Sequence, residues 1–523
     1  MSTLGRRARP PGVSLSTFLA RAPEVEPPER AALLALAQAL LTDVYVHRQQ
    51  KQARYGIDPV QQLRVLRQRM QQLSTRQFHD ELTSIFTALR DRHTGYLAPA
   101  PYAGRAAVLP FLVESCAGPG GKPRYVVSKL ARWCRADPDF RPGVQLSHWN
   151  GMPMDRAVQR NAESQRGAND DARTARGLAS LTTRSLGHGM PPDDDWVVVT
   201  YRAAGRFKEA RFEWRVIDAG GLADENRPAV GSLIAHDPAG QTVQRARQQL
   251  YAPGRVADPW LETTKPSVFS ARPLSARHGY LRIWSFADGD DDGVLAEACR
   301  LVSLLPPGGI VVDIRGNPGG NVPTAERLLQ IFTAGQISPA GFSLADTDVT
   351  LAMSRADPHE LGRWTHSLQA AVSTGEPYSQ AFPLTLHEAA NDLAAERRYP
   401  GPAALIVDPL TYSAADIFAA GFQDNDLGPV LGTARTTGAG GANVWTGAQI
   451  AQRTGDLESW PALPSSGAAF TVAVRRATRV GGRAGLPLED IGVAVDEVHE
   501  PTQADLTHGN RDLLRAAVRL LPR

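Results

Sequence analysis

The spacing of apolar and polar positions changes along the chain and predicts three kinds of structure. The first lies within residues 26–100, where apolar side chains recur at i, i+4, i+7, i+8 and i+11, a helical period. The clearest run consists of Phe78, Leu82, Ile85, Phe86 and Leu89. This spacing predicts an N-terminal helical unit, which ends near Gly95 because glycine and the prolines that follow it stop a helix.

The middle of the chain, residues 105–220, has a strand-like pattern. Short apolar runs such as Val108–Val113 and Trp196–Tyr201 alternate with glycine and proline turns. The segment Pro142–Met154 contains an Asn-Gly pair and predicts a strand, a tight turn and then a helix near Ala157. We therefore expect a mainly β unit here.

From residue 271 to residue 523 the pattern alternates between apolar strands and helices. The expected strands are Gly279–Phe286, Gly309–Ile314 and Ala403–Val407, and the expected helices are Val294–Leu305, Thr324–Thr333 and a helix from Ser413. Continuous apolar strands alternating with helices are typical of an α/β core, a sheet covered by helices. Residues 335–400 do not fit this alternation and are interpreted as an insertion.

Composition agrees with several folded units. A length of 523 residues predicts roughly two to four domains. Residues 1–25 are rich in proline and arginine and are expected to form a loose arm. Residues 221–270 are expected to be a polar linker region. Basic and acidic residues number 57 and 54, and no basic run carries interleaved aromatics, so nucleic-acid binding is not indicated.

Cysteines and apolar runs exclude further classes. The 3 cysteines lie far apart without a C-x-x-C or His/Cys cluster, so we expect no disulfide framework, no metal and no cofactor. No apolar h-region follows the basic N-terminus, and no run approaches the ~18 apolar residues of a membrane span. The sequence predicts a soluble, cytoplasmic protein, although a processed secreted form would look the same.

The first candidate for chemistry is Ser413, where the strand Ala403–Val407 runs through a proline-containing turn into a helix. A serine at this place is exposed to the positive end of a helix, and the N–H of Ala414 could stabilise a developing oxyanion. The competing interpretation is structural, because Ser-x-x-Asp is also a capping box. On this segment alone the cap is favoured.

The second candidate is the glycine-rich turn that follows the strand Gly309–Ile314. Adjacent Gly319 and Gly320 allow a close approach of the backbone to a ligand and present N–H groups together. A phosphate-binding loop is the alternative, but neither of its glycine motifs is present.

These two segments together resemble the C-terminal-processing (tail-specific) peptidase family, which pairs a D-x-R-x-N-x-G-G strand end with a later S-A-x-[DE]-x-[FL] turn. Both motifs stand here in that order, after a strand similar to the family's G-Y-[IL]-x-[IV]-x-x-F. The similarity covers about residues 275–500. It implies a crotonase- or Clp-protease-like spiral core, a PDZ-like middle unit, Ser413 as nucleophile, and an oxyanion hole from Gly319, Gly320 and Ala414.

The base that activates the serine distinguishes two branches of this family. One branch uses a lysine after the serine, but Ala439 stands where that lysine would fall and the last lysine of this chain is Lys265. Arginine cannot replace it, since it keeps its proton. The other branch resembles the tricorn core protease and the chlamydial protease-like activity factor, and uses serine, histidine and a carboxylate.

That second branch implies His93 as the base, because Asp91–Gly95 matches its D-x-H-T segment after the N-terminal helices. Its carboxylate lies in an E-x-x-G-V-x-x-D segment, which matches Glu489 here, with Asp490 as a possible substitute. The neighbouring Arg92 departs from the tricorn pattern, and it could either tune His93 or face solvent.

The resemblance leaves three functions open. The first is a serine peptidase acting on protein or peptide substrates through an acyl-enzyme. The second is a non-catalytic binding protein, since retinoid-binding proteins of the eye resemble the same core. The third is an ester or amide hydrolase using the same serine. Cleavage specificity and oligomeric state are not readable from the sequence.

Overall fold

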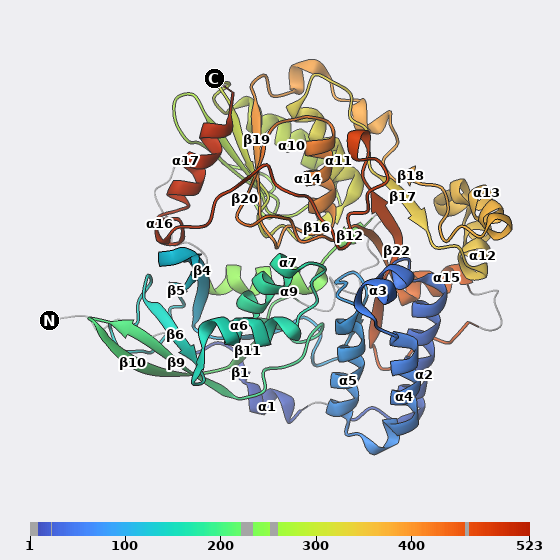
Figure 1. Cartoon of the computed structure of the whole chain (residues 1–523), viewed down its shortest axis with the longest axis horizontal. Helices are drawn as coiled ribbons and strands as arrows, with labels where there is room; N and C mark the ends of the chain where they lie inside the picture. Colours follow the sequence, from blue (N-terminus) through green and yellow to red (C-terminus); the bar gives the residue numbers. More distant parts are fainter. Residues whose placement is uncertain (1–8, 22, 221–233, 252–259, 455–459, 523) are drawn as a thin grey trace.

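The computed structural model describes residues 9–21, 23–220, 234–251, 260–454 and 460–522. An α/β core, a mainly β middle unit and an N-terminal helical unit are present, which confirms the predicted fold class. Figure 1 shows the core at the top, the β unit at the lower left and the helical unit at the lower right. No helix among the described residues is long and apolar enough to cross a membrane.

The helical unit buries one apolar stripe from each of its long helices. It consists of α2 (Pro27–Ala39), α3 (Arg48–Tyr55), α4 (Pro59–Arg69) and α5 (Thr75–Ala88), with a π-helical turn η1 (Leu40–Val44) after α2. Ser74 and Gln77 form a capping box at the start of α5. The predicted run from Phe78 to Leu89 is buried. Because α5 ends at Ala88, the chain leaves the helix shortly before His93.

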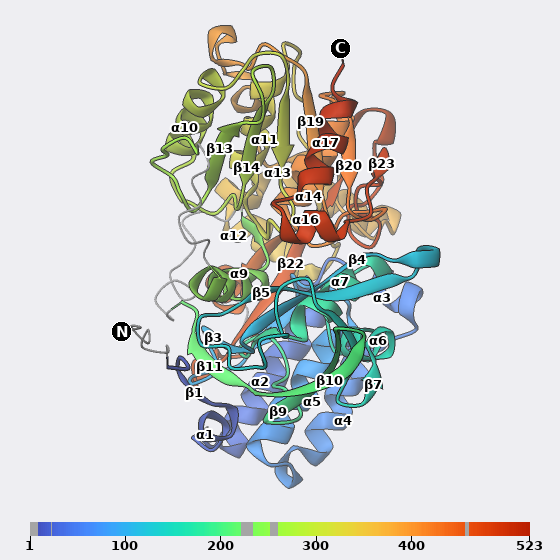
Figure 2. The same ribbon diagram turned by 90° about the vertical axis from the view of Figure 1, so that its left-hand side faces the viewer.

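The middle unit contains two antiparallel sheets, which Figure 2 shows below the core. The larger has the order β10 (Arg206–Glu213), β9 (Trp196–Ala203), β6 (Gln145–Trp149), β5 (Pro123–Leu130), β4 (Phe111–Ala117). The smaller has the order β1 (Val13–Ser14), β11 (Arg215–Asp218), β3 (Arg105–Val108), β8 (Thr183–Ser185). Strand β1 comes from the region predicted to be a loose arm, so the described part of that arm is partly tied down.

Two local predictions in this unit had different outcomes. The single strand expected at Val108–Val113 is wrong: β3 ends at Val108 and β4 begins at Phe111, because Pro110 has no N–H to offer a ladder. The Asn-Gly turn is present, with φ of 47° at Asn150 and 75° at Gly151. It joins β6 to β7 (Met152–Pro153) and to α6 (Met154–Glu163).

The core sheet has the order β13 (Phe269–Pro273), β14 (Gly279–Ile283), β15 (Ile310–Asp313), β19 (Ala403–Val407), β20 (Val430–Gly432), β23 (Glu497–Val498). All pairs from β14 onward are parallel. On one face, Val311 and Ile406 pack against Leu513 of α17 (Arg511–Leu520). The other face carries α10 (Asp291–Ser303), α11 (Val322–Leu329) and α14 (Ala414–Asp424).

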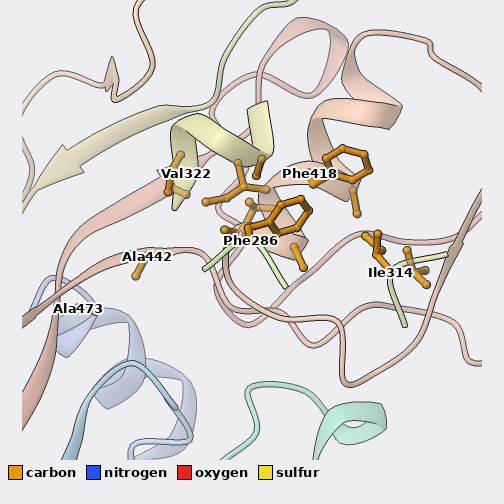
Figure 3. Packing of buried hydrophobic residues seen from close by; sticks show 14 of the residues in the cluster. Phe286, Ile314, Val322, Phe418, Ala442 and Ala473 are labelled. Carbon is orange, nitrogen blue, oxygen red and sulfur yellow. The ribbon is translucent and has the colours of Figure 1, made fainter. Parts of the chain in front are cut away.

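Packing of buried apolar residues around helix α14 is shown in Figure 3. The rings of Phe286, after β14, and Phe418, on α14, have centroids 5.5 Å apart. Val322 and Ile314 belong to the same buried cluster. This apolar layer holds the start of α14 against the end of β14, the edge at which the glycine turn also lies.

A second sheet in the core pairs a strand that follows the helical unit with a strand near the C-terminus. Its long strand β22 (Ala469–Thr478) pairs with β2 (Gly95–Leu97), β17 (Gly341–Leu344) and β21 (Ala442–Thr446), and β18 (Phe382–Pro383) pairs with β17. The region 335–400, interpreted as an insertion, supplies β17, β18 and the helices α12 (Asp348–Ala356) and α13 (Pro358–Thr374). Because β2 begins two residues after His93, its pairing with β22 anchors that histidine to the core.

The region predicted to be a linker, 221–270, contains regular structure in its described part. Strand β12 (Ile234–His236) pairs antiparallel with β16 (Gly319–Asn321), and α9 (Pro238–Tyr251) follows it. Residues 221–233 and 252–259 of that region, and residues 1–8 and 22 of the predicted arm, lie outside the described residues.

One buried carboxyl group in the core gives a pH-dependent prediction. Glu326 on α11 is 1% exposed, and it accepts the N–H of Ala340 at 2.7 Å and the hydroxyl of Thr385. Burial raises the pKa of Glu326 to about 7. The folded state therefore keeps this proton to higher pH than the unfolded chain, so stability falls as pH rises from about 4.5 through about 7.

We expect Glu326→Gln to remove this loss. Urea unfolding at pH 8 should show the variant more stable than the wild type by about 2 kcal/mol, with little difference at pH 5. The exposed Glu388→Gln serves as the control and should be unchanged at both values. A variant that is less stable at pH 8 would mean that the carboxylate itself is required at this position.

Candidate active site

The structure brings Ser413 and His93 together. Ser413 Oγ lies 2.6 Å from His93 Nε2, although the two residues are 320 positions apart. Both are fully buried. The histidine segment is held by β22, because the N–H of Ala473 donates to Thr94 Oγ1 at 3.0 Å and Gly95 pairs with Thr471.

Ser413 occupies a sharp turn between β19 and α14. Its backbone has φ of 71° and ψ of −125°, a conformation that is costly for a residue with a Cβ. The turn is fixed on both sides: the N–H of Tyr412 donates to the carbonyl of Asn317 at 3.0 Å, and the N–H of Ser413 donates to Asp416 Oδ2 at 3.2 Å. A strained strand-to-helix turn of this kind presents a serine hydroxyl at the end of a sheet.

The strain at this turn can be measured. Ser413→Gly should be more stable than Ser413→Ala by about 1 kcal/mol, because glycine adopts positive φ without a Cβ clash. Urea unfolding of the two variants gives the difference.

Ser354 in α12 supplies the control. Its backbone is helical, so the glycine and alanine variants should rank in the opposite order of stability. There the glycine variant should be less stable than the alanine variant by about 1 kcal/mol. Equal stabilities for the two Ser413 variants would show that the turn stores no strain.

Tyr412 lies against the histidine, and sequence reasoning did not identify it. Its ring centroid is 4.6 Å from that of His93, and its hydroxyl is 3.4 Å from His93 Nδ1. The backbone N–H of Arg92 donates to the same hydroxyl at 3.2 Å. The Arg92 side chain does not face solvent but binds Asp237, with Nε at 2.5 Å and Nη2 at 2.6 Å.

Asp91 is the carboxylate next to the histidine. Its Oδ1 accepts the backbone N–H of His93 at 2.8 Å and lies 3.7 Å from His93 Nδ1. Its Oδ2 lies 3.3 Å from Nδ1 of a second buried histidine, His47. Burial alone would raise the pKa of Asp91, but the hydrogen bond and charge of His47 and the charge of His93 hold that pKa well below its usual range.

Glu489 lies farther from His93 than Asp91 does, in a buried charge cluster. Lys51 Nζ is 2.6 Å from both Glu489 Oε1 and Asp490 Oδ1, and Glu489 Oε2 is 4.0 Å from His47 Nδ1. Burial and then the charge of Asp91 raise the pKa of Glu489 well above its usual range, against the lowering effect of Lys51. Of these two neighbouring carboxyl groups, Asp91 is therefore the stronger acid.

Lys51 also belongs to this cluster, and sequence reasoning did not identify it. Its side chain is fully buried on α3. Burial alone would lower the pKa of Lys51, but Glu489 and Asp490 raise it above the ordinary value. A lysine so strongly protonated cannot act as a base, so its role is to hold the two carboxylates.

Three groups in this cluster have the chemistry of metal ligands. One donor atom from each of His47, Asp91 and Glu489 lies within 4.8 Å of the others. The Lys51 ammonium, at 2.6 Å from Glu489, already supplies positive charge there. The cluster is therefore better suited to an internal ion-pair network than to a divalent cation.

The expected oxyanion-hole residues border the serine turn. Gly319 and Gly320 have φ of 96° and 151°, and an added Cβ at Gly320 would lie 2.1 Å from the backbone of Phe286, so glycine is required for this close approach. The N–H of Gly319 donates to Asn317 Oδ1 at 2.9 Å. Ala414 is buried at the start of α14.

The glycine turn is covered by another part of the chain. Strand β12 lies antiparallel on β16, and the N–H of Asp237 donates to the carbonyl of Pro318 at 2.9 Å. Ser413 itself has no exposed surface in this structure.

Two parts of the chain match known protein families. Residues 277–483 match peptidase family S41, and residues 105–224 match the PDZ domain family. No curated protein sequence matches the chain.

Solved structures add a likeness of fold. Mature CPAF has a TM-score of 0.67 at 18% identity, with 94% of this chain and 96% of that chain covered. Mature CPAF complexed with lactacystin has a TM-score of 0.65 at 18% identity, covering 94% and 98%. The photosystem II D1 C-terminal processing protease is more distant, with a TM-score of 0.37 at 15% identity, covering 90% and 93%.

Proposed function

The chain carries a peptidase family S41 domain together with a PDZ domain and is a serine peptidase, and from this premise we propose that it cleaves peptide bonds through an acyl-enzyme on Ser413. One observation carries the proposal: Ser413 Oγ and His93 Nε2 are 2.6 Å apart. This is the hydrogen-bond distance that a nucleophile and its base require.

The steps follow the chemistry of serine acyl transfer. His93 Nε2 takes the proton of Ser413 as the oxygen attacks the scissile carbonyl carbon, and the imidazolium then returns the proton to the leaving amine. Water, activated by the same histidine, hydrolyses the ester and frees the serine. Backbone N–H groups of Ala414, Gly319 and Gly320 are the proposed donors to the oxyanion, and the Gly319 N–H would have to leave Asn317 to serve.

The carboxylate function is shared between two residues in this proposal. Asp91, ionised and 3.7 Å from His93 Nδ1, stabilises the imidazolium that forms during attack. Glu489 acts behind it, through His47, and is itself held by Lys51. The orienting role assigned to Glu489 from the sequence thus becomes one part of a buried network.

Substrates are proteins or peptides, and access to the serine requires opening. Because Ser413 has no exposed surface and β12 pairs with β16, an extended peptide can reach the glycine turn only after that pairing is released. Slow onset of activity is the expected kinetic consequence.

Labelling with a fluorophosphonate probe, followed by peptide mapping, tests the proposal. The wild type should be labelled at Ser413 and should hydrolyse a denatured protein substrate. Ser413→Ala should do neither, and His93→Ala should lose about 10³-fold or more in labelling rate. Ser354→Ala, which changes a buried serine on α12, is the matched control and should behave as the wild type.

The other functions are outcomes of the same experiment. Labelling that persists in Ser413→Ala contradicts the mechanism. A protein that is never labelled and never hydrolyses peptides would be a binding protein on this fold, and labelling with hydrolysis of esters alone would indicate an esterase.

A further inference from the structure

A small polar cavity lies where the helical unit, the middle unit and α9 meet. Its volume is about 50 Å³, and none of the described residues that line it is an aspartate or a glutamate. The polar residues that line it include Arg92, Arg166, Thr183, Arg184, Ser185 and His188. The wall of this cavity is therefore rich in hydrogen-bond donors and positive charge.

Within the described part of the chain, two of these arginines donate to carbonyl and amide oxygens rather than to carboxylates. Arg166 is 6% exposed and donates to the carbonyls of Thr94 at 3.1 Å and His188 at 2.8 Å. Arg184 donates to the carbonyl of Ser180 and to Asn161 Oδ1, both at 2.9 Å. Among the described residues, no carboxylate lies within 4 Å of either guanidinium.

The arginines beside them share a single carboxylate. Asp237 accepts two hydrogen bonds from Arg92 and a third from Arg176 Nη1 at 3.2 Å. Arg176 Nε and Nη2 are buried and have no hydrogen-bond partner within the described part of the chain. Arg92 and Arg176 thus share one carboxylate, and the charges of Asp237 and Asp91 also act on Arg166.

These groups stay charged. Burial lowers the pKa of Arg166 and of Arg184 to about 10, which leaves both protonated at neutral pH. Asp237 and Asp91 compensate the charge of Arg166 in part, and Asp193 that of Arg184. Buried positive charge that lacks a directly paired anion is still costly. The excess charge and the cavity occur at the same place.

We propose that this cavity, bounded by Arg92, Arg166 and Arg184, is a binding site for a small oxyanion. Its volume equals roughly that of four water molecules, enough for a phosphate, a sulfate or a carboxylate group. Guanidinium groups suit such oxygens because they offer paired N–H donors. The Thr183 hydroxyl, buried without a partner within the described part of the chain, supplies a further donor.

The site adjoins the catalytic histidine. Arg166 bonds the carbonyl of Thr94, and the N–H of Arg92 bonds the Tyr412 hydroxyl, so both residues that flank His93 are tied to the cavity wall. An anion bound here would brace the loop that carries His93. The binding itself does not depend on the proposed catalytic mechanism.

Thermal unfolding of the full-length Ser413→Ala protein, titrated with sodium phosphate at constant ionic strength, tests the proposal. We expect a saturable rise in the unfolding midpoint of about 3 °C. Arg184→Met and Thr183→Val, which change the cavity wall, should weaken the apparent affinity at least tenfold, and Arg166→Met should abolish it. Arg206→Met, at an exposed position on β10, is the control and should respond as the parent does.

A second arm separates the two sources of the anion. Short peptides ending in a free carboxylate are compared with their amidated forms in the same titration. A midpoint rise with phosphate indicates a free inorganic ion, and a rise only with the free carboxylate indicates a peptide ligand. Either result supports the site. The proposal is overturned if the unfolding midpoint does not rise, or if its rise neither saturates with anion concentration nor becomes smaller in the cavity variants.

Discussion

Replacing Lys51 with methionine should lower the free energy of unfolding at pH 8 by about 3 to 5 kcal/mol, one of the largest effects expected of a single substitution in this chain. The fully buried ammonium lies 2.6 Å from both Glu489 and Asp490. Methionine fills a similar volume but leaves two buried carboxyl groups without their cation, and only neutral donors such as Tyr55 remain. Urea unfolding measures the loss.

The loss should depend on pH in a defined direction. Because the pKa of Glu489 is already raised and rises further without Lys51, Glu489 takes a proton as pH falls, and one of the two charges without a cation disappears. The destabilisation at pH 5.5 should therefore be clearly smaller than at pH 8.

Lys208 provides a matched control. It also contacts two aspartates, at 2.6 and 3.2 Å, but it lies at the surface. Lys208→Met should leave stability measurably unchanged, since exposed ion pairs are screened by solvent. A Lys51→Met variant as stable as the wild type at pH 8 would show that Glu489 and Asp490 tolerate the loss of their cation.

Asp91→Asn should lower kcat by about 10³- to 10⁴-fold with little change in KM, a larger loss than Glu489→Gln causes. Asparagine keeps the shape and can still accept the N–H of His93. It removes the negative charge that faces the imidazole at 3.7 Å. Steady-state hydrolysis of a fluorogenic peptide by the two variants, with circular dichroism to verify folding, measures the contrast.

The ranking of the two variants decides which carboxylate serves His93. A larger loss in Glu489→Gln would return the orienting role to that residue. His47→Gln adds a third comparison: if His47 acts through Asp91, its variant should shift the pH at which kcat falls, while KM stays unchanged.

Much of the architecture was readable from local pattern. The buried strands and covering helices of the core follow from apolar runs and helical periods, which depend on neighbours in sequence. The turn before α14 and the glycine turn after β15 were identified the same way, from proline, serine and glycine at strand ends. The break at Pro110 was readable in the same way, because a proline inside an apolar run marks a position that cannot donate to a ladder.

The sequence by itself determined the α/β core, the helical and β units, and a serine at a strand-to-helix turn, because each depends on spacing within a short window. Only the tertiary structure decided which side chains surround that serine. His93 reaches it through the pairing of β2 with β22, and Asp91, His47, Lys51 and Glu489 come together from both ends of the chain. Such contacts are set by long-range strand pairing and by burial, which pairs charges that no local pattern connects.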